Sequence, residues 1–167
     1  MHSETRQSII RILDGHRLMT IATVRPDGWP QATVVSYVND GLTLYCFVSR
    51  LGQKFANIAR EPRVSAAIGA EFSNTSDIKG LSLAAHAALV ADKTDYERIT
   101  SAFIERFPEY ADWPRPNPAF APLVKLTPEV VSIVDYSKGF GHSELVAVSG
   151  RDLQPSSESK RHSWFGA

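Results

Sequence analysis

The residues best suited to chemistry lie between positions 44 and 65, in the segment LYCFVSRLGQKFANIAREPRVS. An apolar strand-like run ends before Arg50, the chain turns at Gly52, and a predicted helix begins with Gln53 and Lys54. Cations are unfavourable at the positive N-terminal end of a helix unless an anion joins them. Two cations beside free helix N–H groups are typical of a phosphate site. The alternative is that both side chains extend into solvent.

This cationic segment stands out because the chain as a whole is neutral. Its 167 residues contain 18 Lys and Arg against 18 Asp and Glu. A neutral balance argues against binding to nucleic acid or to an anionic membrane. We find no signal peptide and no apolar run of about 18 residues, so we expect a single-domain cytoplasmic protein with no membrane partner.

Other reactive side chains form no recognisable cluster. Cys46 is the only cysteine, which excludes an intrachain disulfide and a cysteine-based zinc cluster, and its apolar neighbours predict a buried, unreactive thiol. His86 alternates with alanines, so we favour a core or dimer-interface histidine over a proton donor. The histidines lack metal-ligand spacing, and we expect no metal site. The segment 139–142, GFGH, precedes no helix and is interpreted as a turn.

Hydrophobic periodicity predicts the elements that position these residues. Helices are expected at 3–14, 52–61 and 94–107. β-branched and aromatic residues at period two, with Asp-Gly turns between the first runs, predict an antiparallel meander. The six expected strands cover 17–24, 31–38, 42–48, 63–70, 79–92 and 123–137, the fifth being long enough to need a bend or bulge. We therefore predict a mainly β fold, a closed antiparallel β-barrel with helices at its openings.

Three segments carry a resemblance to a known family: TIATVRPDGWPQATVVSYV, LTLYCFVSRLGQKFANIAREPRVS and KGLSLAAHAALV. They resemble the core of the pyridoxamine 5′-phosphate oxidase-like, FMN-binding split-barrel superfamily over about residues 8–136. The resemblance implies a six-stranded antiparallel split barrel at 1–136, and a C-terminal extension at 137–167 that packs on the barrel or on a partner subunit. It also implies a homodimer with FMN in the subunit interface.

The same resemblance implies where FMN would bind. Lys54 matches the family lysine that contacts the phosphate, and Gly80 falls where the true oxidases carry a glutamine, so that only a backbone contact is expected there. Two side chains just past the last predicted strand are expected to fold over the flavin. The full set of expected cofactor-binding residues is Thr33, Val34, Val35, Ser36, Phe47, Val48, Ser49, Arg50, Gln53, Lys54, Gly80, Lys138 and His142.

Departures from the family pattern narrow the expected activity. The oxidases carry an arginine where this chain has Gln53, and Arg50 is expected to compensate. The arginine and lysine of their second strand are replaced by small or hydroxyl residues near Ala32 and Ser36. Their C-terminal strand and its arginine-histidine segment are missing, so we do not expect oxidation of pyridoxamine phosphate itself.

We therefore expect an FMN-dependent oxidoreductase acting on an unidentified small molecule, with the redox chemistry supplied by the flavin. No residue is assigned a catalytic role. Two alternatives stay open: a deazaflavin-dependent reductase using the same phosphate site, and a flavin- or haem-binding sensor or storage protein without turnover. The haem alternative needs an axial ligand, for which His86 and His142 are the candidates.

Overall fold

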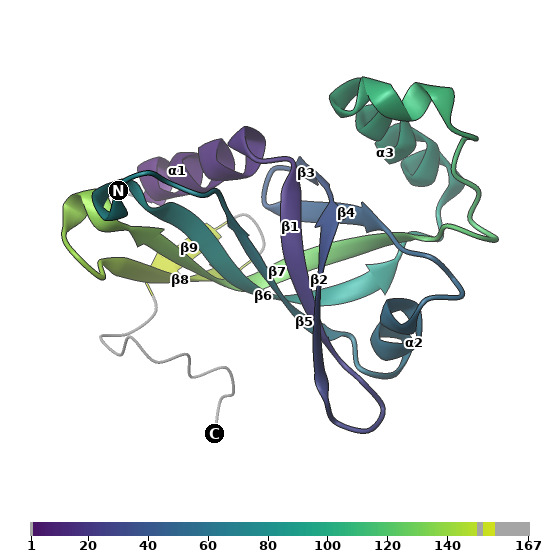
Figure 1. Ribbon diagram of the computed structural model, residues 1–167, viewed down its shortest axis with the longest axis horizontal. Helices are drawn as coiled ribbons and strands as arrows, with labels where there is room; N and C mark the ends of the chain where they lie inside the picture. The colour runs from purple at the N-terminus through teal and green to yellow at the C-terminus, as the bar shows by residue number, and fades with distance from the viewer. Residues whose placement is uncertain (1, 150–151, 156–167) are drawn as a thin grey trace.

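The computed structural model describes residues 2–149 and 152–155. In these residues, α-helices and short 3-10 helices surround one curled sheet (Figure 1). The α-helices are α1 (His2–Gly15), α2 (Gln53–Arg60) and α3 (Lys93–Arg106), and the short 3-10 helices are η1 (Thr75–Asp77), η2 (Pro108–Asp112) and η3 (Tyr136–Lys138). The strands are β1 (Leu18–Val24), β2 (Pro30–Ser36), β3 (Val38–Asp40), β4 (Thr43–Phe47), β5 (Arg63–Gly69), β6 (Lys79–Leu89), β7 (Leu123–Asp135), β8 (Ser143–Ser149) and β9 (Asp152–Pro155).

The barrel is formed by the strand order β2-β1-β5-β6-β7-β4-β3, in which every pair is antiparallel. Only Tyr37 separates β2 from β3, so the chain itself joins the two edges of this path. The prediction of a split barrel is confirmed. Its six expected strands are present, because the run expected at 31–38 is divided between β2 and β3.

Two strands were missed at the C-terminal side. β8 pairs with β7, and β9 pairs with β8. Along β8, SELVAVS, the core-facing Val146 and Val148 alternate with Leu145 and Ala147, and Val146 is buried together with Leu153 of β9. The polar composition after residue 139 hid this alternation. Residues 156–167 of the predicted extension lie outside the described residues, and the division at residue 136 stays a prediction.

Two apolar cores lie on the two faces of β4. Leu44 and Cys46 point into the barrel, where α1 contributes buried side chains, whereas Tyr45 and Phe47 point outward and pack under α3. Burial raises the pKa of the Cys46 thiol to about 12, which agrees with the predicted unreactive cysteine. Among the described helices, none combines the length and the apolar character needed to cross a membrane.

Candidate functional site

The loop from β4 to α2 presents the start of α2 without a side-chain cap. The Gly52 N–H donates to the Ser49 carbonyl at 3.0 Å and closes the turn. A Cβ at Gly52 would lie 3.2 Å from that carbonyl oxygen, so glycine suits this tight approach. No side chain caps the helix at Gly52, and no acidic residue lies in the first turn. This helix start therefore carries positive potential that an anion would stabilise.

Lys54 lies in this first turn and is half-buried. Within the described residues its ammonium group makes no hydrogen bond or ion pair. Burial lowers the pKa of Lys54, because the charged form loses solvation. A partly desolvated cation without a counter-charge is poorly satisfied by the protein alone, and it is suited to an anionic ligand.

Arg50 is engaged elsewhere. Its Nε donates to the Ala119 carbonyl and its Nη2 to the Pro118 carbonyl, each at 2.9 Å. The guanidinium carbon lies 5.0 Å from the ring centroid of Phe55, and the Arg50 backbone N–H donates to the Phe120 carbonyl at 3.0 Å. Arg50 therefore holds the proline-rich loop against α2, and its predicted contact with a phosphate stays a prediction.

A buried amide network connects α2 to the β1–β2 hairpin, and the sequence reasoning missed it. Asn57 is fully buried. Its Nδ2 donates to Thr23 Oγ1 at 2.9 Å and to Gln31 Oε1 at 3.0 Å, and its Oδ1 accepts from Gln53 Nε2 at 2.8 Å. The available signal was Asn57 itself, a polar residue beside Ile58 on the buried side of the helix. Gln53, expected to touch the cofactor, is thus an anchor of this network.

The residues of β2 expected beside the flavin ring alternate between two faces. Val35 packs against the barrel core, and Thr33 pairs across the ladder with the buried Ile21. The Thr33 Oγ1 atom is buried without a hydrogen-bond partner. Val34 is 64% exposed on the outer face. A ligand outside the barrel would therefore meet the side chains of Val34 and Ser36, but only the backbone of the other two.

An aromatic row joins the strand ends to α3. The Ser36 hydroxyl lies 2.8 Å from the Tyr110 hydroxyl, and the Phe47 ring lies beside the rings of α3. Neighbouring ring centroids are 4.8–6.0 Å apart along the row Phe47, Phe103, Phe107, Tyr110 and Trp113. Ser36 and Phe47, both expected at the flavin, are thus held by one rigid aromatic stack.

Val48 and Ser49 follow β4 directly and lead into α2, whereas three other expected site residues lie at the other end of the barrel. Gly80 pairs with Val134 near the end of β7, and Lys138 and His142 follow in the turn to β8. The Lys138 Nζ lies 2.7 Å from Glu144 Oε1, and His142 Nε2 lies 3.1 Å from the same oxygen. Phe47 instead pairs with Leu123, at the start of β7. Leu123 and Val134 are eleven residues apart, so at about 3.3 Å per residue the two groups are separated by roughly 36 Å along the strand. Figure 1 shows α2 and β8 on opposite sides of the molecule. One chain does not bring all these residues to one ligand.

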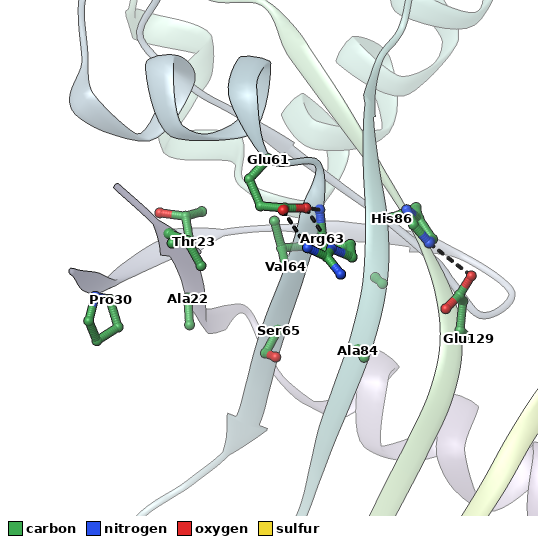
Figure 2. A pocket seen from close by; sticks show the side chains of 12 residues that line it. Ala22, Thr23, Pro30, Glu61, Arg63, Val64, Ser65, Ala84, His86 and Glu129 are labelled. Carbon is green, nitrogen blue, oxygen red and sulfur yellow. Dashed lines mark hydrogen bonds and ion pairs between the residues drawn. The ribbon is translucent and has the colours of Figure 1, made fainter. Parts of the chain in front are cut away.

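A groove of about 580 Å³ lies on the outer face of β1, β5 and β6. It opens where β1 and β5 separate, since they pair only from Thr20 to Ala22. Figure 2 shows Ala22, Thr23 and Pro30 on one side of β5 and the His86–Glu129 pair on the other. Small side chains of the three strands form its floor.

The histidine of this groove is not a core residue, which corrects one of the two favoured interpretations. The side chain of His86 is 49% exposed, and its Nε2 lies 2.9 Å from Glu129 Oε1. His86 occupies an outward position between the buried Ala85 and Ala87. The predicted irregularity of this long strand is present as a register shift between Ala84 and Ala85, opposite the position of Glu129 in β7. The place of His86 in a dimer interface stays a prediction.

Comparisons with known proteins agree with this architecture. The family model for pyridoxamine 5′-phosphate oxidase matches residues 6–135. General stress protein 26 of Bacillus subtilis is 26% identical over 111 residues, which span 66% of this chain and 78% of that protein.

Two solved structures illustrate the shared fold. General stress protein 26 from Bacillus anthracis has a TM-score of 0.65 and 19% identity, covering 87% of this chain and 99% of that chain. A heme binding protein from Mycobacterium smegmatis has a TM-score of 0.70 and 20% identity, covering 85% of this chain and 57% of that one. Since the family match spans most of the sequence and the barrel is the one expected, the chain belongs to the pyridoxamine 5′-phosphate oxidase-like family of split-barrel proteins.

Proposed function

We propose that this protein binds FMN and acts as an FMN-dependent oxidoreductase on a small molecule. The observation that carries the proposal is Lys54, a half-buried cation without a partner among the described residues, at the uncapped start of α2. A phosphate ester is the anion that matches one lysine together with free helix N–H groups.

The residues around α2 fit such a cofactor. Lys54 and the N–H groups of the first turn would hold the phosphate, and the backbone of Thr33 together with Ser36 and Phe47 would line the ring. Bound FMN would supply the electron-transfer chemistry. The chain would bind and orient it, and we assign no acid, base or nucleophile.

We further propose a homodimer, on two grounds. Two adjacent rows across the outer face of six strands contain no charged residue, namely Ala32, Ala22, Ser65, Ala84, Val130 and Ala147, and Val34, Thr20, Ala67, Ser82, Ser132 and Leu145. Such a broad uncharged face is typical of a surface that is covered by another chain. Residues such as Gly80 and Lys138 would reach a cofactor at α2 only from a second subunit.

The heme binding relative motivates the main alternative, a haem-binding protein without turnover. Both candidate axial ligands have Nε2 beside a carboxylate: His86 beside Glu129 and His142 beside Glu144. An iron ligand at Nε2 would have to break these contacts, whereas Lys54 has no partner in the part of the chain that the structure describes. The geometry therefore favours a phosphorylated flavin over haem.

Titration of the purified protein with FMN tests the proposal. We expect quenching of free FMN fluorescence and retention of yellow absorbance after gel filtration. The absence of both, or displacement of FMN by haem at equal concentration, would overturn the proposal.

Competition between FMN and a deazaflavin separates the two flavin types. Turnover of NAD(P)H with a dye or oxygen supports an enzyme, whereas a single stoichiometric reduction indicates a binder. A monomer by sedimentation in the presence of FMN would contradict the dimer.

A further inference from the structure

The amide network beneath α2 is positioned to control how the cofactor is held. We propose that Asn57 is a positioning residue that fixes the start of α2 relative to β2, so that the phosphate and the ring of one ligand are bound together. This inference rests on the proposed function, because it takes Lys54 and the α2 N-terminus as the phosphate site.

The network lies where the barrel itself cannot hold α2 in place. Beyond Ala22, β1 no longer pairs with β5, so Thr23 lies at the edge of the resulting gap. Figure 2 shows Thr23 beside this groove, and its side chain is almost fully buried. The buried hydroxyl needs a hydrogen-bond partner, and the amide of Asn57 provides it at 2.9 Å.

The side chain of Asn57 is used to near its full hydrogen-bonding capacity. Both amide hydrogens have acceptors, Thr23 Oγ1 and Gln31 Oε1, and the amide oxygen accepts from Gln53 at 2.8 Å. An aliphatic residue of similar size would leave the buried Thr23 hydroxyl unpaired and would remove the hydrogen bonds to Gln31 and Gln53. An aspartate would lack the donors, and a glutamine would not fit the same distances.

These three bonds connect the two ends of the proposed cofactor site. Gln53 is the neighbour of Lys54 in the first turn of α2, and Gln31 lies two residues before Thr33 on β2. A chain of two hydrogen bonds through Asn57 therefore spans from the helix start to the ring-side strand. A displacement of about 1 Å is enough to weaken contacts that depend on alignment. Loss of Asn57 should thus affect the phosphate contacts more than the ring contacts.

The test compares FMN with riboflavin, which has the same ring but no phosphate. Dissociation constants for both are measured with the wild type, Asn57→Leu and Gln31→Met, the last removing only the link to β2. We expect Asn57→Leu to lower FMN affinity about tenfold and riboflavin affinity less than about threefold. Gln31→Met should lower the ratio of FMN affinity to riboflavin affinity by about threefold. This variant keeps the test valid if Asn57→Leu does not fold.

The matched control is Thr100→Val in α3. Thr100 is also fully buried and its Oγ1 donates to the Tyr96 carbonyl at 2.7 Å, so its loss should lower thermal stability and leave the FMN-to-riboflavin ratio unchanged. An unchanged ratio in both Gln31→Met and any folded Asn57→Leu would overturn the role of Asn57. A wild type that binds FMN no better than riboflavin would instead overturn the phosphate site, and this inference with it.

Discussion

The lysines at the two ends of the barrel differ in whether a carboxylate of the chain neutralises them. At the η3 end, Lys79 lies 3.4 Å from Asp135, and Lys138 lies 2.7 Å from Glu144. The hydrogen bond that Lys138 donates to the Glu144 carboxylate raises the pKa of Lys138. At the α2 end, burial lowers the pKa of Lys54, which has no such partner among the described residues.

This difference indicates which end is built for an external anion. Paired cations at η3 are satisfied within the chain, although exposed pairs contribute only about 0–1 kcal/mol each. An unpaired, partly desolvated cation lowers stability until a ligand neutralises it, as is common at binding sites. At the η3 end the lysine charges are therefore paired within the chain, whereas at the α2 end we propose that an external anion pairs with the lysine.

Replacing the unpaired lysine should have the largest effect. Lys54→Met removes the only side-chain charge in the first turn of α2, so we expect FMN affinity to fall about 100-fold, or about 2.7 kcal/mol. The thermal midpoint of the ligand-free protein should rise slightly, because the desolvated charge is gone. Lys79→Met, at the η3 end where Lys79 pairs with Asp135, is the control and should change FMN affinity less than about threefold. Equal losses in the two variants, measured by fluorescence titration, would remove the distinction between the ends.

A backbone change at the η3 end should have the next largest effect, on stability. A Cβ at Gly80 would lie 2.7 Å from the Ile68 carbonyl oxygen, whereas a Cβ at Gly69 would lie 3.6 Å from its nearest neighbour, the Lys79 carbonyl oxygen. We expect Gly80→Ala to lower the free energy of unfolding by about 2 kcal/mol, since a backbone atom cannot move aside easily. Gly69→Ala, on the facing strand, should stay within about 0.5 kcal/mol. Denaturant unfolding measures both, and similar values for the two variants would contradict the close approach. This crowding also explains why a family-type glutamine does not suit position 80.

The role of Arg50 gives a smaller contrast within the α2 end. Arg50→Met should lower the free energy of unfolding by about 1 kcal/mol through the loss of its two hydrogen bonds to the proline-rich loop, and should lower FMN affinity less than tenfold. Arg60→Met is the control, because Arg60 also donates to a backbone carbonyl, that of Pro26 at 2.8 Å, but lies at the far end of α2. A loss of affinity in Arg50→Met as large as in Lys54→Met would mean that Arg50 contacts the phosphate directly.

The smallest effect should be the pH dependence of the η3 end. The hydrogen bond from Lys138 lowers the pKa of Glu144 below its usual value of 4.5. The stability that this carboxylate provides is therefore complete above about pH 4.5 and is lost as the pH falls through the lower, folded-state pKa. Between pH 7 and pH 3 the thermal midpoint of the wild type should fall about 1–2 °C further than that of Glu144→Gln. Parallel curves would show that the pair does not stabilise the fold.

Local signals in the sequence were sufficient for most of the fold. Asp-Gly turns with positive φ at Gly28 and Gly41 join the early strands, and the period-two runs became strands close to their predicted positions. β8 was not predicted because the polar residues and glycines after position 139 surround its short apolar run, LVAV. The break between β2 and β3 at Tyr37 was also missed, since curvature of a strand follows from closure of the barrel rather than from its own residues.

In the candidate site, the residue with a local signal was predicted, whereas contacts between residues distant in the sequence were not. Lys54 was recognised because its place at a helix start is a local property. Asn57 was not, because its partners Thr23 and Gln31 are 34 and 26 residues away in the sequence. Nor could the sequence show that Arg50 is taken up by carbonyls 68 and 69 residues further along.

The sequence by itself determined the antiparallel strands, their connecting turns and the cationic start of α2. These follow from turn chemistry and from helical and strand periodicity, which act over a few residues. Only the tertiary structure decided which cations have carboxylate or carbonyl partners within the chain. Lys138 meets Glu144 across a turn and Arg50 meets the proline-rich loop, while Lys54 is half-buried and has no partner in residues 2–149 and 152–155. Charge pairing depends on strand register and loop placement, and those are properties of the folded chain.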